Sequence, residues 1–171
     1  MQNLYGVRYG LIHRARSVQN RLQGIYSRLR MKYRAFLDSN VFIYAFEFPD
    51  SNSSKIIDLL NDKIIEAVIS ELVIAEVYRY FRRFHEKRLA DTFRKYLYDS
   101  CTVVLTKDVE YAMSRYRGQI KERDLEQLTV VKEYGIKYVI SYDRDFDNVE
   151  EHKTPKQYVE LMGLNTSDVE Y

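Results

Sequence analysis

The sequence predicts an α/β fold with a central, mostly parallel β-sheet. Two observations favour this class. Several short apolar runs have the length of strands, and the longer segments between them have helical periodicity. Strands separated by helices in this way form parallel sheets. The chain has 171 residues, which suffice for one domain with a substantial core and are too few for two ordinary domains.

Four strands are expected in this sheet. The segments 35–37, 67–69, 102–105 and 138–141 are short, rich in aliphatic or β-branched side chains, and separated by longer segments. The first of them ends at Asp38. Because each pair of strands is separated by enough residues for a helical crossover, we expect neighbouring strands to run in the same direction.

The segments between the strands carry helix signals. Helices are predicted over residues 40–46, 70–85, 89–97, 109–116 and 123–134, with a further helix capped by Ser53 or Ser54 and a last one that begins at Pro155. Ser70 and Thr154 are expected to cap the helices that follow them. Gly135 is expected to end the preceding helix in a left-handed conformation.

Composition excludes several classes of protein and site. The single cysteine, Cys101, rules out a disulfide framework, and the three histidines are too far apart for an ordinary zinc site. No run of about 18 apolar residues is present, so no membrane span is predicted and a cytoplasmic protein is expected. The lack of a glycine-rich turn excludes a Rossmann cofactor domain and a P-loop enzyme.

Charge divides the chain into two parts. Residues 1–34 carry eight basic side chains and no acid, whereas residues 35–171 carry 19 basic and 25 acidic side chains. We predict a basic N-terminal extension over residues 1–32, followed by one domain over residues 33–171. The extension has the apolar spacing of a basic amphipathic helix. Alternatively, Met31 is the native start, and the residues before it lie upstream of the protein.

Three carboxylates follow predicted strands. Asp38 comes directly after the first strand, and Asp143 and Asp145 come just after the fourth. In an open parallel sheet, the carboxyl ends of the strands share one edge, and ligands bind there. A single aspartate after a strand is commonly part of a turn or a helix cap. Three carboxylates from two strand ends indicate a shared site instead.

Two further acids lie on predicted helices. Glu76, Arg79 and Arg83 line one edge of the apolar face of the helix over residues 70–85. That apolar face consists of Val73, Val77, Tyr80, Phe81 and Phe84. Asp124 lies at the start of a helix, where the helix dipole favours a carboxylate whatever the function. The arginines beside an acidic cluster suit a substrate that carries phosphate.

Taken together, the acids predict a metal site. Asp38, Glu76, Asp124 and Asp143 would repel one another in one pocket, so all of them ionise only beside a compensating cation. Oxygen ligands without histidine favour a hard ion, Mg²⁺ or Mn²⁺. Such an ion activates water and stabilises the charge that develops on a phosphodiester. The residues therefore point to metal-assisted phosphoryl chemistry on nucleic acid.

Four stretches of the sequence carry these acids in order. They are residues 36–44 (FLDSNVFIY), 70–77 (SELVIAEV), 123–125 (RDL) and 134–146 (YGIKYVISYDRDF). The stretches resemble the motifs of PIN-domain (PilT N-terminus) nucleases, among them VapC-like toxins. The last one is the most specific, because Ser141 and Asp143 reproduce a serine or threonine, one intervening residue and an aspartate. The likeness covers about residues 33–160.

The resemblance assigns roles to individual residues. The acids implied to be catalytic and to bind the metal are Asp38, Glu76, Asp124 and Asp143, with Asp145 as a further metal ligand. The residues implied to orient the acids or to bind substrate are Asn40 and Ser141. Arg79 and Arg83 are predicted to bind substrate from their place beside Glu76, and not from the resemblance. Asn40 and Ser141 have an alternative interpretation as a helix cap and a strand-end hydroxyl.

The resemblance also implies the fold, the reaction and the partners. It implies a three-layer α/β/α domain and a divalent-metal-dependent endoribonuclease that hydrolyses RNA and uses Mg²⁺ or Mn²⁺. The implied partners are RNA, an antitoxin protein and a second copy of the chain. No association with a membrane is implied. The sequence departs from the family at its basic extension and at Glu126 and Gln127, where small or apolar residues are common.

Two other functions stay open at this point. A haloacid-dehalogenase-like phosphatase also has an aspartate after its first strand, but it needs a second one two positions later, where this chain has Asn40. A catalytically silent PIN-fold protein that binds RNA or acts as a scaffold is the other alternative. The acids at all four positions argue against a silent protein, and an assay decides.

Overall fold

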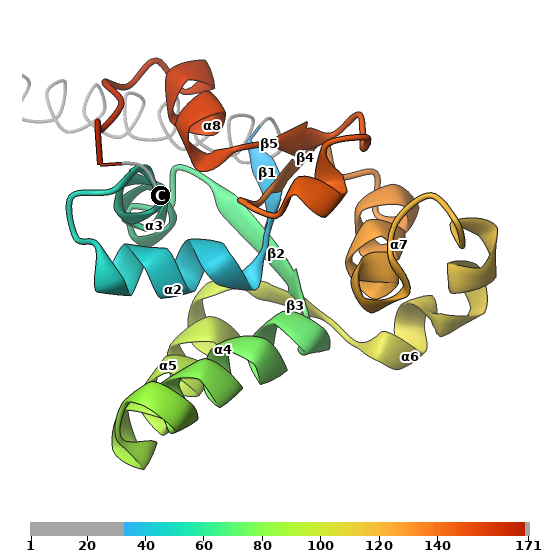
Figure 1. Ribbon diagram of the computed structural model, residues 1–171, viewed down its shortest axis with the longest axis horizontal. Coiled ribbons are helices and arrows are strands. Elements are labelled where there is room, and N and C mark those ends of the chain that lie inside the picture. Colours follow the sequence, from blue (N-terminus) through green and yellow to red (C-terminus); the bar gives the residue numbers. More distant parts are fainter. Residues whose placement is uncertain (1–32, 170–171) are drawn as a thin grey trace, which may run out of the picture.

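A five-stranded sheet forms the centre of the protein. The computed structural model describes residues 33–169, so the predicted extension over residues 1–32 lies outside the described residues. The strands are all parallel and lie in the order β3-β2-β1-β4-β5 (Figure 1). They are β1 (Arg34–Leu37), β2 (Glu66–Ser70), β3 (Thr102–Val104), β4 (Tyr138–Ile140) and β5 (His152–Lys153).

The central strand, β1, is apolar and buried. Phe36 lies opposite Val68 of β2 and Val139 of β4. The side chains of Ala35, Phe36 and Leu37 are fully buried. Strands that are covered by helices on both faces of a parallel sheet are apolar along their whole length, which is why this segment reads as a continuous apolar run.

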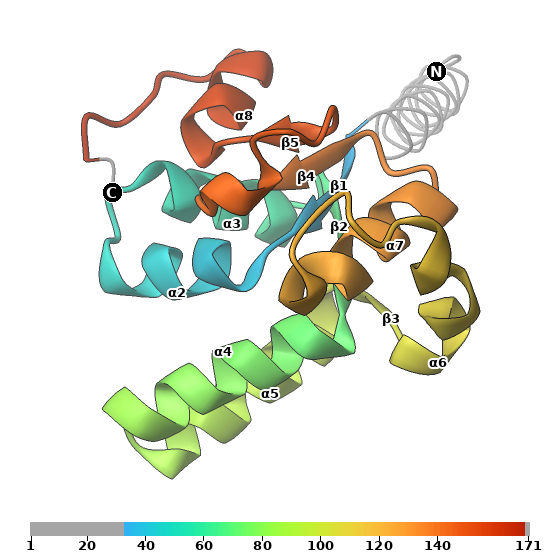
Figure 2. The same ribbon diagram turned by 45° about the vertical axis from the view of Figure 1, so that its right-hand side comes forward.

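Seven α-helices of the described chain flank the sheet in the predicted three-layer α/β/α arrangement. They are α2 (Ser39–Glu47), α3 (Asn52–Asn61), α4 (Glu71–Phe84), α5 (Lys87–Ser100), α6 (Thr106–Val109), α7 (Leu125–Glu133) and α8 (Pro155–Leu161). Three short 3₁₀ helices are η1 (Glu110–Arg115), η2 (Glu122–Asp124) and η3 (Arg144–Phe146). Both views show α4 and α5 as a hairpin that extends away from the sheet (Figures 1 and 2).

Several helix ends form as the sequence predicts. The Ser70 hydroxyl caps α4 by accepting a hydrogen bond from the Val73 amide at 3.4 Å. Thr154 and Gln157 form a reciprocal capping box at the start of α8, with Pro155 as its first residue. Gly135 follows α7 with φ of 57°, a left-handed conformation that glycine adopts without strain.

Three local predictions need correction. The cap of α3 is Ser51, whose hydroxyl accepts from the Ser54 amide at 3.1 Å, and not Ser53 or Ser54. The segment predicted as a helix over 109–116 is mainly the 3₁₀ helix η1, whose side chains reach sideways to Glu133. β5 and η3 were not predicted, because two or three residues are too few to show a periodicity.

The inward face of α4 is shorter than the sequence predicts. Val73, Val77 and Phe81 are fully buried, as expected. Phe84, which was expected on the same apolar face, is 60% exposed, because it is the last residue of α4 at the tip of the hairpin. No helix in residues 33–169 is both long enough and apolar enough to cross a membrane.

Candidate metal centre

The candidate site lies where β1 and β4 end side by side. Asp38 follows β1 directly, and its backbone amide donates to the carbonyl of Ile140, the last residue of β4, at 3.1 Å. This bond aligns the two strand ends at one edge of the sheet. Asp143 and Asp145 follow β4 and the next residue, Ser141, so the carboxylates predicted from the two strands do meet at this edge.

Asp38 is held by hydrogen bonds to both of its carboxylate oxygens. Oδ1 accepts from the Ser39 amide at 2.7 Å and from Gln127 Nε2 at 3.2 Å. Oδ2 accepts from Asn40 Nδ2 at 2.7 Å and from the Ser141 hydroxyl at 2.5 Å. With only 5% of the residue exposed, these donors fix the carboxylate in one orientation. Asp38 is therefore both the N-cap of α2 and a rigid member of the site.

Ser141 links Asp38 to Asp143. Its hydroxyl oxygen accepts from Asn40 Nδ2 at 3.0 Å and from the Asp143 amide at 2.9 Å, while its proton goes to Asp38. Asn40 Oδ1 also accepts from the Tyr142 amide at 3.3 Å. The polar pair predicted to orient the acids thus contacts both strand-end segments, and each group has a defined donor or acceptor role.

Asp124, Asp143 and Asp145 form a compact acidic cluster. Each can contribute one carboxylate oxygen so that the three atoms lie within 4.8 Å of one another. Asp124 ends η2 and is buried, and Asp143 begins the turn that leads into η3 by accepting from the Asp145 amide at 2.9 Å. Three oxygen donors at this spacing suit a hard divalent cation.

Two basic side chains are paired with this cluster. The guanidinium of Arg123 contacts all three acids, with Nε 3.2 Å from Asp124 Oδ2, and Nη2 2.9 Å from Asp143 Oδ2 and 2.6 Å from Asp145 Oδ2. Lys121 Nζ lies 2.7 Å from Asp145 Oδ1. The protein therefore places positive charge of its own at the point where the carboxylates converge.

Glu76 approaches the cluster from α4. Burial raises the pKa of Glu76, a hydrogen bond from Ser39 opposes the rise, and the negative charges of Asp38 and Asp124 add to it. These electrostatic interactions place Glu76 beside both acids, although it lies outside the compact group of three. The helix thus carries its predicted acid to the edge of the sheet.

The pKa values of Asp38 and Asp124 are raised, whereas that of Asp145 is lowered. Burial raises the pKa of Asp38, and repulsion from Asp124 and Asp143 contributes, against the hydrogen bonds from Ser141 and Ser39. Burial also raises the pKa of Asp124, although Arg123 opposes the rise. Lys121 and then Arg123 lower the pKa of Asp145. Burial, with repulsion from neighbouring acids, thus disfavours the charged forms of Asp38, Glu76 and Asp124, and a bound cation would relieve this cost.

The two arginines predicted to bind substrate form no ion pair with the acids within the described residues. Arg79 and Arg83 are exposed on α4. Arg79 still lowers the pKa of Glu76 through its charge. The guanidinium of Arg83 instead lies over the ring of Phe84, 5.2 Å from its centroid.

Sequence reasoning missed Lys121, Arg123 and Gln127 as members of the site. Arg123 is adjacent to Asp124 in the sequence. Gln127 comes three residues after Asp124, which is about one turn of helix. Gln127 is 1% exposed, so a long polar side chain within the apolar face of α7 was the available signal. Its departure from the family pattern is explained by its hydrogen bond to Asp38.

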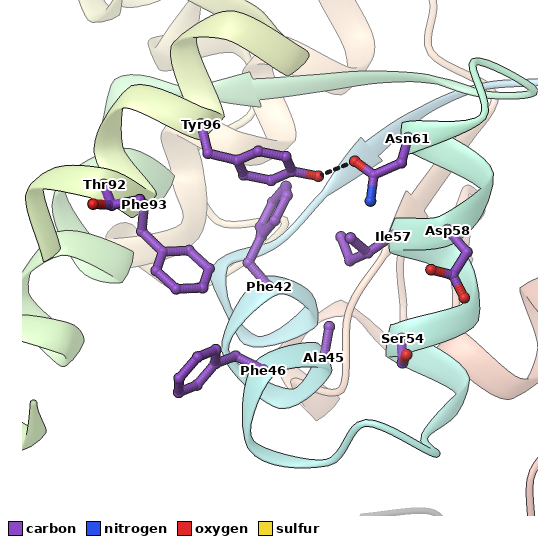
Figure 3. A pocket seen from close by; sticks show the side chains of 10 residues that line it. All are labelled: Phe42, Ala45, Phe46, Ser54, Ile57, Asp58, Asn61, Thr92, Phe93 and Tyr96. Carbon is purple, nitrogen blue, oxygen red and sulfur yellow. Dashed lines mark hydrogen bonds between the residues drawn. The ribbon is translucent and has the colours of Figure 1, made fainter. Parts of the chain in front are cut away.

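An apolar cavity of about 320 Å³ lies elsewhere, between α2, α3 and α5 (Figure 3). Its walls include the rings of Phe42, Phe46, Phe93 and Tyr96. The Tyr96 hydroxyl donates to Asn61 Oδ1 across its rim at 2.8 Å. None of the acids of the candidate metal centre lines this cavity, so the two features are separate.

Solved structures with the same fold include several from toxin–antitoxin systems. A toxin–antitoxin complex from Klebsiella pneumoniae aligns with a TM-score of 0.56 and 16% identity over 71% of this chain and 97% of the other. VapBC2 from Rickettsia felis, bound to a DNA fragment from its promoter, gives a TM-score of 0.57 and 13% identity over 71% and 98% of the two chains. Mycobacterium tuberculosis VapC20, described as a toxin that cleaves the sarcin-ricin loop, gives a TM-score of 0.53 and 18% identity over 68% of this chain and 97% of the other.

A match between the sequence and a family model identifies the family of this chain. No curated protein matches the chain. The family model described as "PIN domain" matches residues 35–152, which includes every acid of the candidate metal centre and most of the described sheet. The chain belongs to the PIN domain family.

Proposed function

We propose that this protein is a divalent-metal-dependent endoribonuclease that hydrolyses RNA phosphodiester bonds. The observation that carries the proposal is the convergence of Asp38, Glu76, Asp124, Asp143 and Asp145 at one edge of the sheet. A site with this excess of carboxylates favours cation binding over direct nucleophilic attack, because the Ser141 hydroxyl donates to Asp38, and His152 contacts Ser141 only at its backbone carbonyl.

The donor set fits Mg²⁺ or Mn²⁺. Asp124, Asp143 and Asp145 would hold the ion, since their oxygens lie within 4.8 Å of one another and already attract the guanidinium of Arg123. Asp38 and Glu76 would supply further negative charge beside it. When bound, the ion supplies Lewis-acid stabilisation of the phosphodiester and lowers the pKa of water.

The other residues of the site position these groups. Ser141 and Asn40 lock the Asp38 carboxylate by donating to Oδ2, and Gln127 holds Oδ1 from the side of α7. Glu76 lies beside Asp38 and Asp124, and its pKa is raised, chiefly by burial. Arg123 would move to the phosphate of the substrate once a metal ion neutralises the carboxylates.

A toxin of a toxin–antitoxin pair is the biological role that we propose. It rests on solved structures of the same fold, which are toxin–antitoxin complexes at 12–16% identity and a toxin at 18% identity. An antitoxin protein and a second copy of the chain would then be partners, in a cytoplasmic setting. Analysis of the neighbouring reading frame tests this role: a small gene of the antitoxin type beside it is the expected result.

Incubation of the purified full-length chain with defined RNAs, with Mg²⁺, Mn²⁺ or EDTA, tests the reaction. We expect cleavage only with the metals and a 5′-phosphate on the downstream product. Asp143→Asn should abolish cleavage, because it removes a charged ligand while its remaining oxygen still accepts from the Asp145 amide. Asp58→Asn, on the exposed side of α3, is the matched control and should cleave normally.

Cleavage that survives EDTA, or that continues at full rate in Asp143→Asn, contradicts the proposal. RNA binding without cleavage of any RNA in either metal would favour the alternative of a catalytically silent PIN-fold protein. The site itself argues against that alternative, because buried hydrogen bonds hold Asp38, and burial raises the pKa values of Asp38 and Asp124. Such a costly arrangement is typical of functional sites.

A further inference from the structure

The hairpin of α4 and α5 carries a second feature that the metal centre does not use. We propose that its tip is a base-stacking platform for single-stranded RNA, with Phe84 as the stacking residue and Arg79 and Arg83 as phosphate contacts. The inference rests on the proposed function, because it concerns how the same substrate is held beyond the acids. It adds a subsite about 12 Å along α4 from Glu76, at 1.5 Å of rise per residue.

One face of α4 connects the two sites. Glu76, Tyr80 and Phe84 are spaced by four residues, so they follow one another along the helix surface. Arg79 and Arg83, also four residues apart, form the adjacent row. A strand bound at Glu76 and running toward the hairpin tip would therefore meet two positive charges and then an aromatic ring.

The ring of Phe84 is unusually accessible. The residue is 60% exposed, although it is a large hydrophobic side chain. Its neighbours orient it: Arg83 lies over the ring at 5.2 Å, and the ring of Tyr80 meets it at 4.9 Å with a tilt of 46°. Tyr80 is itself anchored by donating a hydrogen bond to Glu47 at 3.0 Å. An exposed aromatic ring held by an arginine and a second ring is suited to stack on a nucleobase.

Charge identifies nucleic acid as the partner of this surface. Residues 79–88 contain five basic side chains, Arg79, Arg82, Arg83, Lys87 and Arg88, and one acid, Glu86. This concentration occurs in a region, residues 35–171, in which acids outnumber basic residues by 25 to 19. Within residues 33–169, Arg82, Arg83, Lys87 and Arg88 form no ion pair, so their charge is available to a polyanion.

A single strand fits better than a duplex. In a duplex, the bases are stacked on one another, and only a single strand presents a base that can leave its neighbours for a protein ring. Phe84 is the last residue of α4. Both views show the hairpin extending away from the body of the protein, so a splayed base can reach its tip (Figures 1 and 2). The recognition that follows is tolerant of sequence, because every base has a π-face.

The chain contains no tryptophan, which provides a clean optical test. Phe84→Trp in the full-length chain keeps an aromatic ring at the tip and adds a single tryptophan, which can be excited selectively at wavelengths where the 16 tyrosines do not absorb. We expect its emission to be quenched on titration with an eight-nucleotide oligoadenylate in EDTA, where the strand is not cleaved. An abasic strand of the same length should bind through its phosphates and leave the emission unchanged.

Tyr111→Trp is the matched control. Tyr111 is 67% exposed and also has an arginine over its ring, Arg115 at 5.5 Å, but it lies on η1 beside Glu133. Its emission should not respond to either strand. Phe84→Ala should lower the affinity for oligoadenylate about 5- to 150-fold, the range measured for one stacked base. Arg83→Gln should reduce the salt dependence of binding by about 0.7 in the logarithmic slope.

The outcomes separate this inference from the proposed nuclease function. Absence of quenching in the Phe84→Trp chain, or equal quenching by the abasic strand, overturns the platform, and metal-dependent cleavage measured separately would leave the nuclease standing. Quenching by oligoadenylate in EDTA, together with no cleavage of any RNA in the separate assays with Mg²⁺ and Mn²⁺, supports the platform and contradicts the nuclease. A Phe84→Ala chain that changes its oligomeric state in sedimentation while its RNA affinity stays unchanged assigns the surface to a protein contact and overturns the inference.

Discussion

At the scale of single residues, Arg123 controls the acidic cluster. Its guanidinium contacts Asp124, Asp143 and Asp145 at 3.2, 2.9 and 2.6 Å, respectively. A divalent ion and this side chain would neutralise the same oxygens, so the two compete. We expect Arg123→Gln to tighten Mn²⁺ binding about tenfold in a calorimetric titration, because the ion no longer displaces an internal cation.

Arg117→Gln provides the control for this variant. Arg117 also pairs with an acid, Glu122 at 3.1 Å, but it lies outside the cluster. Its removal changes the net charge by the same amount and should leave the Mn²⁺ affinity within about twofold of the original. Unchanged or weaker binding in Arg123→Gln would contradict the competition between the arginine and the metal.

The charged form of Glu76 lowers the free energy of unfolding, and this effect depends on pH. Its pKa is raised, chiefly by burial, so the folded protein binds this proton more tightly than the unfolded chain does. Its contribution to stability is therefore present below its ordinary pKa of about 4.3 and is lost as the pH rises through the folded value. In EDTA, Glu76→Gln should melt at a higher temperature than the original chain, by a margin that grows from pH 4.5 to pH 7.

The same thermal series on Asp58→Asn calibrates the effect, since Asp58 is exposed on α3. Its melting temperature should follow that of the original chain at every pH. Because Mn²⁺ supplies the missing positive charge, adding the ion at pH 7 should remove most of the advantage of Glu76→Gln. A margin that is constant or shrinks as the pH rises would show that burial of Glu76 carries no such cost.

At the scale of elements, the ends of helices and strands were predictable where a local interaction decides them. Ser70 and Thr154 cap helices through hydrogen bonds to residues three positions later, so the signal lies within four residues of sequence. Ser51 was missed because three serines, at positions 51, 53 and 54, offer the same chemistry. Only the extended backbone of Ser51 selects the one that caps.

Other elements depend on partners that are distant in sequence. The tight turns of η1 place Tyr111, Arg115 and Tyr116 against Glu133, and these contacts override the helical pattern over residues 109–116. β5 exists because His152 and Lys153 pair with Val139 and Ile140 at the edge of the sheet. No local pattern contains that information.

The capping box of α8 gives a prediction at this scale. Thr154→Ala removes the hydroxyl that accepts from the Gln157 amide at 3.3 Å. We expect a loss of about 1 kcal/mol in the free energy of unfolding. That loss corresponds to a melting temperature lower by about 2–4 °C for a domain of this size. Ser114→Ala, at an exposed position of η1, should leave the melting temperature unchanged, and an equal drop in both variants would contradict the role of the cap.

At the scale of the whole molecule, the parallel sheet explains how much of the site the sequence could predict. Asp38, Asp143 and Asp145 were expected together because the topology brings the ends of parallel strands to one edge of the sheet. This placement can be predicted without knowing how the side chains pack. Arg123, Lys121 and Gln127 were not expected. Their contacts depend on how η2 and α7 approach the sheet, which is a tertiary property.

The proposed division of the chain can be tested by truncation. Every strand of the described sheet lies within residues 34–153, so a chain that begins at Met31 should melt within about 4 °C of the full-length chain. If the basic extension contributes to RNA binding, its removal should also flatten the salt dependence of RNA affinity. A drop of more than about 10 °C would show that the extension belongs to the folded core.

We propose that the carboxylates converging at the ends of β1 and β4 form a divalent metal site. Calorimetric titration of Mn²⁺ into the metal-free chain tests it most directly, because it does not depend on finding the right RNA. We expect saturable binding in the original chain and in Asp58→Asn, and affinity at least tenfold weaker in Asp143→Asn, which removes one charged member of the cluster. Equal affinity in Asp143→Asn and the original chain, or no binding in any of the three, would contradict the account.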